Sequence, residues 1–565
     1  MRRGGNRPGA AGAYYSGRVT LDEREAADGV DAPGDGEEPR DRRRRLALST
    51  VFFSIATGFS RVAGLVREVV AASYFGVTAP MSAFTIAFQV PNLVRALFAD
   101  AALQGAFVPV FAELLEKNQK KEAFKVASAM LSLIFVVLGS ITLAFMLAAP
   151  VLMPLFAPGF RDQPELQHLT SGLSQVMFPL VLLLSLSGVT VGMLNTFERF
   201  SVPALAPVAW NLVIIASLAG ITPLLHGDNQ VYSYAIGVLI GTVVQFVLPL
   251  PWLRGTGGRF TLTFDWRNPY VVRIAKLMLP VTVALGVINF DLLINSFIGT
   301  LVDERVPAAV DKAFRIYMLP QGLFSVAIAT ILFPTLARLV ARGDTDGLRA
   351  TMANGLRQIL LTLIPSAVVM AVLAEPITRL VYQRGEFDAQ ATHLVSTAMF
   401  WWAFSLPAQG ASLLLTRTFF ALQRPWITTA LSVASMALNV AVSLALYKPF
   451  GISGIVIGTV VGTLGLASLQ AYLVRRDTNG LEGARMVAAL TRIAAAATLM
   501  GFVLYGVWWV ADDVLGRALW AQILAVGGAV VAGAGAYGAA IWALRVPEAR
   551  QIAALLGGRL RRRPG

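Results

Sequence analysis

The sequence predicts an all-α polytopic membrane protein that crosses the bilayer about fourteen times. Its 565 residues are 56% hydrophobic and only 14% charged, a composition typical of such proteins and unlike that of soluble enzymes. From Leu46 onward, apolar runs of about 20 residues or more, the length that spans a bilayer as a helix, follow one another with short polar breaks. An internal duplication further arranges the predicted helices in two lobes.

The elements follow in order from the N-terminus. Residues 1–45 are rich in glycine, proline and charge, and we expect them to form a disordered cytoplasmic tail. We place helices near 48–75, 82–114, 123–156, 166–195, 202–225, 231–253, 270–301, 309–341, 350–381, 389–421, 426–447, 452–474, 487–510 and 519–544. A basic tail, 546–565, ends the chain.

Basic residues concentrate in every second connection between the predicted helices. Examples are Lys117, Lys120, Lys121, Arg254, Arg259, Arg342, Arg349, Arg475, Arg476 and Arg485. The intervening connections are poor in lysine and arginine. Because basic loops stay on the cytoplasmic side, this pattern predicts that both termini are cytoplasmic.

Similar segments recur at nearly one spacing along the chain. Separated by 225 or 226 residues are Pro109 and Pro334, Gly159 and Gly385, and Arg199 and Arg424. We therefore predict two pseudo-symmetric six-helix lobes, 46–254 and 255–476, with two C-terminal helices in 477–545. Parallel repeats of this kind bind substrate between the halves and alternate access by rocking them.

Composition excludes several classes of function. The net charge of +14 would suit a nucleic-acid partner, but the basic residues lie at the ends of apolar runs, where they orient helices. There is no cysteine, and the three histidines are scattered, so thiolate and histidine metal sites are not expected. We find no P-loop and no Gly-x-Ser-x-Gly motif. The sequence therefore predicts a protein that is not an enzyme and binds no nucleic acid.

Charged residues stand inside the predicted helices, where each costs roughly 3 kcal/mol to insert. They are Arg61, Arg67, Glu68, Arg95, Asp100 and Arg315. The helical rise places Arg61 and Arg95 near the middle of the membrane and Arg67 and Arg315 further toward the outside. We therefore expect the four guanidinium groups to converge on one central cavity. Guanidinium groups bind phosphate oxygens through two parallel hydrogen bonds, which indicates a substrate-binding site for an anionic headgroup.

The alternative is that each arginine pairs with a nearby acid for structural reasons. Glu68 lies seven residues from Arg61, on nearly the same helical face, and Asp100 is close to Arg95 in the sequence. Four arginines against two acids nevertheless leave positive charge over. That surplus favours a ligand the size of a diphosphate.

A further acid, Asp291, lies within the helix predicted at 270–301. Asn295 follows one turn later, and Asn439 lies in the helix at 426–447. Their oxygens are candidates for binding a monovalent cation or relaying a proton; the alternatives are a salt bridge to an arginine and ordinary interhelical hydrogen bonding. In the duplication, Asp291 falls opposite Glu68.

The chain closely resembles the MurJ/MviN family in six segments, FSRVAGLVRE, PNLVRALFADAALQGAFVPVFAE, LFAPGF, LNTFERFSVPALAP, LPQGLFSVAIATILFP and YQRGEF. This family comprises bacterial lipid II flippases of the multidrug/oligosaccharidyl-lipid/polysaccharide exporter superfamily. The resemblance covers 46–545. It implies a cationic central cavity for the diphosphate and sugars, and a groove for the undecaprenyl tail formed with the last two helices. The family's functional arginines fall on Arg61, Arg67, Arg95 and Arg315.

The chain departs from the family pattern at a few positions. Glu68 stands where an aspartate is frequent, Ser82 where an acid is common, and Phe314 where aspartate is usual. Asn295 stands where some members place an acid of a monovalent-cation site. Coupling to sodium is therefore not implied for this chain.

The resemblance implies a flippase that moves lipid II from the inner to the outer leaflet of the bacterial plasma membrane by alternating access. Alternatives are an exporter of another polyprenyl-linked glycan or of a cationic drug, and a non-transporting scaffold for cell-wall assembly. A cationic cargo disagrees with the excess of arginine. Expected partners are lipid II, membrane lipids and cell-wall synthesis machinery. No cofactor is expected, and coupling to the membrane potential or to a monovalent cation stays open.

Overall fold

The computed structural model describes residues 39–98, 101–256, 258, 260–261, 263–478 and 480–548. Their α-helices are α1 (Pro39–Phe75), α2 (Ala79–Phe98), α3 (Ala101–Glu116), α4 (Lys120–Phe156), α5 (Pro164–Met177), α6 (Pro179–Thr196), α7 (Ser201–Ile221), α8 (Tyr232–Val247), α9 (Pro269–Thr300), α10 (Val306–Pro320), α11 (Val326–Ala341), α12 (Thr345–Val372), α13 (Ala374–Tyr382), α14 (Ala389–Ala403), α15 (Leu406–Ala421), α16 (Pro425–Phe450), α17 (Ile452–Asp477), α18 (Gly483–Leu515) and α19 (Leu519–Ala543). Short helical turns are η2 (Pro158–Phe160), η3 (Thr222–Leu224), η4 (Gly227–Val231), η5 (Leu250–Leu253) and η6 (Gln321–Ser325).

The described residues contain helices and no strand, which confirms the predicted fold class. Within them, ten helices or helix pairs are long and apolar enough to cross a membrane. Every predicted helix overlaps an observed helix or a pair of helices. The pairs are α2 with α3, α5 with α6, α10 with α11, α12 with α13, and α14 with α15.

Proline accounts for several of these breaks, because it lacks the N–H that continues a helix. Pro179 opens α6, and α15 has a proline in its first turn. Pro320 ends α10 directly before the π-helical turn η6. Apolar runs that look continuous in the sequence are thus divided into shorter helices.

The chain divides into two compact units, Met1–Ser54 and Ile55–Gly565. In the first, α1 already begins at Pro39, so 39–45 are helical where we predicted disorder; arginine-rich sequence propagates a helix readily. The disorder predicted for 1–38 lies outside the described residues. All that follows concerns the second unit.

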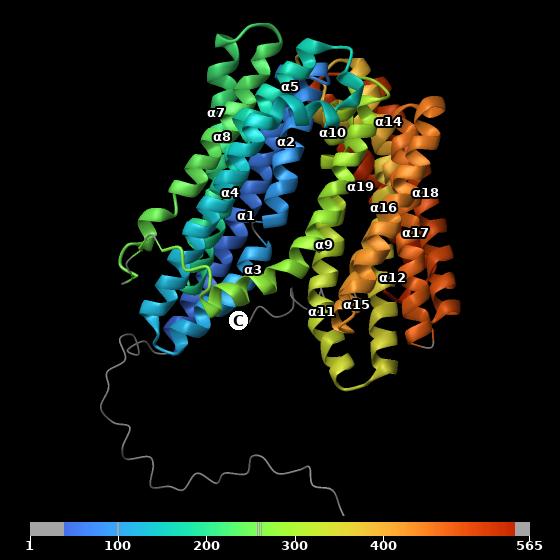
Figure 1. The fold of residues 1–565 in the computed structure, drawn as a ribbon. Helices are drawn as coiled ribbons and strands as arrows, with labels where there is room; N and C mark the ends of the chain where they lie inside the picture. The colour runs from blue at the N-terminus through green and yellow to red at the C-terminus, as the bar shows by residue number, and fades with distance from the viewer. Residues whose placement is uncertain are drawn as a thin grey trace, which may run out of the picture. The chain divides into compact units, whose positions relative to one another are not determined.

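Two groups of helices make up the second unit, with α9 packed against both (Figure 1). In the first group, α2 to α6 pack together and α7 pairs with α8. In the second, α10 to α17 pack together, and the hairpin of α18 and α19 packs against α12 and α13. Helix α9 contacts α2, α3 and α4 on one side and α10, α16 and α17 on the other.

The connections lie at two opposite ends of the bundle. Those between α3 and α4, α11 and α12, and α17 and α18 lie at the lower end in Figure 1 and carry basic residues; we call this the basic end. The connections between α4 and α5 and between α13 and α14 lie at the other end, the upper end.

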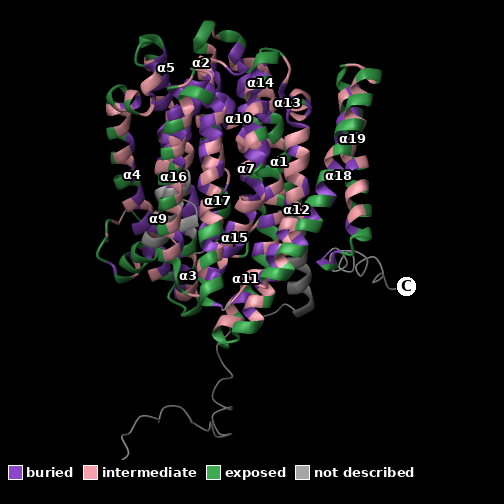
Figure 2. Cartoon of the chain, turned by 90° about the vertical axis from the view of Figure 1, so that its right-hand side faces the viewer, coloured by how far each residue is buried: buried purple, intermediate pink, exposed green. Residues whose placement is uncertain are grey.

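Buried residues gather toward the interior of the bundle, and exposed residues lie at its ends and periphery (Figure 2). Many of the exposed residues are large and apolar. Leu147, Phe502, Val531 and Trp542 are between 74% and 77% exposed. Such exposure is unfavourable in water but suits hydrocarbon, where only the backbone polar groups must be satisfied internally. The exposed apolar surface therefore fits a chain that lies in a membrane.

Candidate functional site: a charged central cavity

A cavity of about 430 Å³ lies between the two groups of helices. Residues of α1, α2, α9, α10 and Tyr382 at the end of α13 line it. Its charged lining residues are Arg61, Arg67, Glu68, Asp311 and Arg315. Three of the four arginines predicted from the sequence thus meet in one cavity.

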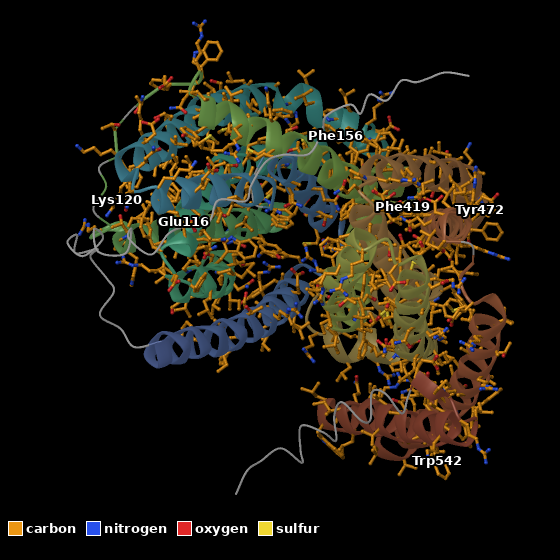
Figure 3. The ribbon with its side chains drawn as sticks, turned by 90° about the horizontal axis from the view of Figure 1, so that it is seen from below. Glu116, Lys120, Phe156, Phe419, Tyr472 and Trp542 are labelled. Atoms are coloured by element: carbon orange, nitrogen blue, oxygen red, sulfur yellow. The ribbon has the colours of Figure 1, made fainter. Side chains whose placement is uncertain are left out.

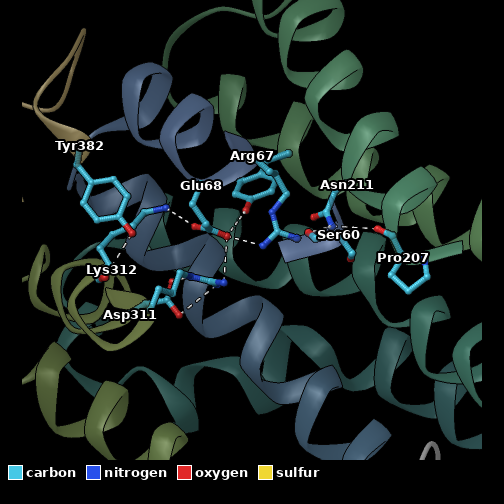
Figure 4. Close-up of polar contacts among 10 residues, drawn as sticks. Ser60, Arg67, Glu68, Pro207, Asn211, Asp311, Lys312 and Tyr382 are labelled. Carbon is cyan, nitrogen blue, oxygen red and sulfur yellow. Dashed lines mark hydrogen bonds and ion pairs between the residues drawn. The ribbon is translucent and has the colours of Figure 1, made fainter. Parts of the chain in front are cut away.

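Glu68 is the centre of a buried ion-pair cluster (Figure 4). Its carboxylate accepts hydrogen bonds from Arg67 Nη2 at 2.5 Å and Lys312 Nζ at 2.8 Å. Arg315 Nη1 lies 3.0 Å from the same carboxylate, and the Tyr234 hydroxyl donates to it at 3.3 Å. A single carboxylate on α1 therefore contacts cations of α1 and α10 and the hydroxyl of Tyr234 in α8. It thus links the first group of helices to the second.

A second acid, Asp311, supports Arg315 from within α10. Arg315 Nε donates to Asp311 Oδ2 at 2.8 Å, across one helical turn. The spacing of four residues puts both side chains on one face of the helix. Lys312 is fully buried beside them and donates to Glu68. Asp311 and Lys312 were missed as site residues in the sequence, although two charges in an apolar helix were a visible signal.

The cluster does not neutralise itself. Arg61, Arg67, Lys312 and Arg315 carry four positive charges, and Glu68 and Asp311 carry two negative charges, which leaves a net charge of +2. Arg61 is exposed and lines the cavity, and its guanidinium has no ion pair or hydrogen bond with any residue that the structure describes. Pairing of Glu68 with Arg61, the structural alternative, is therefore wrong: Arg67 and the cations of α10 take that carboxylate.

Arg67 is held from its other side by an aromatic ring. Its guanidinium lies 4.6 Å from the centroid of the Trp210 ring, a geometry in which the ring face attracts a cation. The adjacent Asn211 donates to the carbonyl of Ser60 at 3.4 Å and so links α7 to α1 (Figure 4). Helices α7 and α8 thus fix where α1 presents its charges.

One predicted arginine, Arg95, does not line the cavity. Arg95 Nε donates to Asn92 Oδ1 at 3.0 Å. Asn92 lines the cavity and Arg95, one turn further along α2, does not. Asp100 lies outside the described residues, so its predicted closeness to Arg95 stays a prediction.

The three residues of the predicted ion site do meet. Asn439 Nδ2 donates to Asp291 Oδ1 at 2.8 Å and to Asn295 Oδ1 at 3.2 Å. Thr459 of α17 accepts from Asn295 at 3.1 Å. The described residues contain no group of three or more His, Asp or Glu side chains that would hold a metal. The cluster therefore has one carboxylate and several neutral oxygens, and its binding of a cation or proton stays a prediction.

The upper end is closed by two contacts that the duplication relates. The backbone N–H of Glu386 donates to the Ser73 carbonyl at the end of α1, at 2.9 Å. The N–H of Gly159 donates to the hydroxyl of Thr300 at the end of α9, at 3.1 Å. Gly385, beside Glu386, has a φ of +58°, and a Cβ on either glycine would overlap the facing backbone. Each contact thus seats a glycine loop against the end of a long helix, α1 in one case and α9 in the other.

Ser82, one of the departures from the family pattern, adds to this closure. Its hydroxyl accepts a hydrogen bond from the N–H of Ala308 in the first turn of α10, at 3.1 Å. First-turn N–H groups of a helix have no partner within it, so this bond satisfies one of them and joins α2 to α10.

Comparison with known proteins agrees with this architecture. The family model described as "Lipid II flippase MurJ" matches residues 71–519. A probable lipid II flippase MurJ of Rhizobium meliloti is 32% identical over 455 residues, covering 80% of this chain and 84% of that protein. A probable lipid II flippase MurJ of Haemophilus influenzae is 29% identical over 514 residues, covering 85% and 97%.

Solved structures show the same fold. One titled "Lipid II flippase MurJ, inward closed conformation" superposes with a TM-score of 0.69 at 23% identity, covering 86% of this chain and 98% of that one. An inward-facing MATE multidrug transporter of the MOP superfamily gives a TM-score of 0.63 at 17% identity, covering 75% and 96%. With the family model matching most of its length, the chain belongs to the lipid II flippase MurJ family.

Proposed function

We propose that this chain flips lipid II from the inner to the outer leaflet of the bacterial plasma membrane, with the diphosphate bound in the central cavity. Membership of the MurJ family supports the activity. The observation that carries the proposal is the net charge of +2 on the charged cluster beside the cavity, to which Lys312 contributes from behind the lining. Surplus buried cations are expensive in a membrane, and a diphosphate supplies the missing negative charge.

Arg61 and Arg315 are suited to make the first contacts with the headgroup. Arg61 has no described partner, and the Arg315 side chain, although paired, is 32% exposed. The diphosphate would compete with Glu68 and Asp311 for Arg315. Since a guanidinium offers five donors, Arg315 can keep one carboxylate while it binds a phosphate oxygen. The pairs present before binding thus hold the donors in position.

The proposed orientation of the chain in the membrane rests on the basic residues at one end and on the contacts at the upper end. We propose that the basic end faces the cytoplasm, as lysine- and arginine-rich loops do, and that the upper end faces outside. The contacts of Glu386 with Ser73 and of Gly159 with Thr300 then close the outer side. Release to the outer leaflet requires that these two contacts break, which is the alternating step.

Energy coupling is a second part of the proposal. Asp291 and its amide neighbours lie away from the cavity lining, between α9, α16 and α17. We propose that a monovalent cation or a proton on Asp291 sets the packing of α16 and α17 against α9. Asp291→Asn would then leave headgroup binding unchanged but remove the dependence of flipping on the ion gradient. Unchanged gradient dependence would contradict this part alone.

The experiment that tests the function uses Arg61→Ala in a strain depleted of its own flippase. Because Arg61 has no described partner, this variant leaves the ion pairs of the cluster intact and should insert and fold normally. We expect loss of growth, since one charge-assisted hydrogen bond of about 2 kcal/mol is removed from the bound headgroup.

Arg342→Ala is the matched control: Arg342 is an exposed arginine at the end of α11, outside the cavity lining. It should support growth. Arg61→Lys should support growth in part, because lysine keeps the charge but not the planar fork. Full growth with Arg61→Ala at normal protein levels would contradict the proposal.

A further inference from the structure

A second cavity lies at the basic end of the bundle, and its lining comes from other helices than those that carry the charged cluster. It measures about 410 Å³ and is lined by residues of α12, α15, α17 and α18 and by Leu481 and Gly483 at the start of α18. None of these residues lines the central cavity. We call this cavity the α17–α18 crevice.

The lining of the crevice is almost entirely apolar. Leu356 and Leu415 form its buried floor, and Tyr472 and Val487, each 60% exposed, stand at its sides. Figure 3 shows the molecule from the basic end, with Tyr472 at the periphery of the second group. A crevice lined in this way favours hydrocarbon over water, so in a membrane it suits an acyl chain.

One residue of this lining is positively charged. Arg475, in the last turn of α17, is exposed, and its guanidinium forms no ion pair or hydrogen bond with a described residue. Its neighbour Asp477 is already paired with Arg424 at 2.6 Å. Long basic side chains near helix ends reach toward the lipid headgroups. The crevice thus offers a hydrocarbon slot with an unpaired guanidinium beside it.

The walls of the crevice are held in place by buried ion pairs. Arg357 of α12 donates to Glu482, which precedes α18, at 2.9 Å, and to Glu548, which follows α19, at 2.5 Å. Glu548 is 3% exposed, so the first residues of the predicted tail at 546–565 are packed; the rest of that tail lies outside the description. These pairs fix the start of α18 against α12, and the crevice does not need to form on binding.

We propose that the α17–α18 crevice binds one anionic phospholipid of the leaflet at the basic end, with an acyl chain in the crevice and the phosphate on Arg475. The apolar lining selects a lipid chain, and the unpaired guanidinium selects a headgroup with negative charge over a neutral one. The crevice is distinct from the central cavity proposed to hold the transported headgroup, because the two share no lining residue. The proposal does not depend on the transport activity.

Binding is measured on the purified full-length chain by native mass spectrometry, with phosphatidylglycerol and phosphatidylcholine titrated separately. We expect phosphatidylglycerol to bind more tightly, and Arg475→Ala to weaken it about fivefold, the effect of one basic residue near a charged lipid surface. Arg476→Ala is the matched control, since Arg476 is the next residue, equally exposed, and does not line the crevice. Arg475→Ala should weaken phosphatidylcholine binding less, because the choline ammonium already offsets the charge of that lipid's phosphate.

A filling variant tests the crevice itself. Ala471→Trp places a large side chain where Ala471 lines it, and should abolish the tight binding of phosphatidylglycerol. Equal binding of the two lipids, or equal effects of Arg475→Ala and Arg476→Ala, would overturn the proposal whether or not Ala471→Trp folds. So would displacement of phosphatidylglycerol from the crevice by undecaprenyl phosphate, which would assign the crevice to a polyprenyl tail.

Discussion

Gly385→Ala tests whether the close backbone approach at the upper end holds the cavity shut on that side. Gly385 has a φ of +58°, and a Cβ there would overlap the Ser73 carbonyl at the end of α1. The substitution forces the loop away from α1 and breaks the bond from the Glu386 N–H to that carbonyl. We therefore expect the population to shift toward conformations in which the upper end is open.

A control variant separates the effect of the lost contact from the effect of backbone strain at a positive φ. A non-glycine residue at positive φ costs about 1–2 kcal/mol, and Gly227→Ala bears the same strain, because Gly227 has a φ of +60° with open space around it. Only Gly385→Ala also loses the hydrogen bond, worth about 1 kcal/mol. We expect the open population of Gly385→Ala to exceed that of the control at least about fivefold.

Distance measurements between two spin labels provide the assay. The chain has no cysteine, so Asp162→Cys and Ala389→Cys introduce the only labelling sites, both exposed and on opposite groups at the upper end. Electron–electron double resonance should show a longer distance gaining weight in Gly385→Ala. Identical distance distributions in Gly385→Ala and Gly227→Ala would refute the role of this contact.

Three further substitutions test other contacts described above. Gly159→Ala should open the upper end as Gly385→Ala does, in the same labelled background, because its Cβ would overlap the Thr300 carbonyl; an unchanged distance would refute the pairing of the two loops. Lys312→Met should lower the free energy of unfolding by about 1.5–3 kcal/mol, one charge-assisted hydrogen bond, and an unchanged melting temperature in detergent would contradict this. Arg357→Ala should lower it by about 3–5 kcal/mol, because buried carboxylates lose their partner, and faster proteolysis of α18 should report the loss.

Much of the site was predictable because charge inside an apolar run is visible in the sequence. Arg61, Arg67 and Glu68 stand out in α1, and Arg315 in α10, for that reason alone. Which carboxylate each arginine meets depends on how α1 packs against α10, and the helical spacing within α1 suggested the wrong partner. Asp311 and Lys312 were not predicted as site residues, although their charges also stand inside an apolar run.

The fold, like the site, was predictable from the sequence only in part. Hydropathy predicts where helices lie, but it does not show where a helix breaks inside an apolar run, as α10 does before η6. The duplication predicted that Gly159 and Gly385 are equivalent, yet it did not predict what they contact. Those contacts depend on how the two groups of helices come together, which no local pattern encodes.

We propose that surplus guanidinium charge in the cavity binds the lipid diphosphate while lipid II crosses the membrane. The most direct test of this proposal is the rate of lipid II flipping in proteoliposomes, with wild type, Arg61→Ala and Arg342→Ala reconstituted at equal density. We expect wild type and Arg342→Ala to flip lipid II at equal rates, and Arg61→Ala to be slower by at least about tenfold, as a loss of about 2 kcal/mol requires. Equal rates for all three proteins would contradict the proposal.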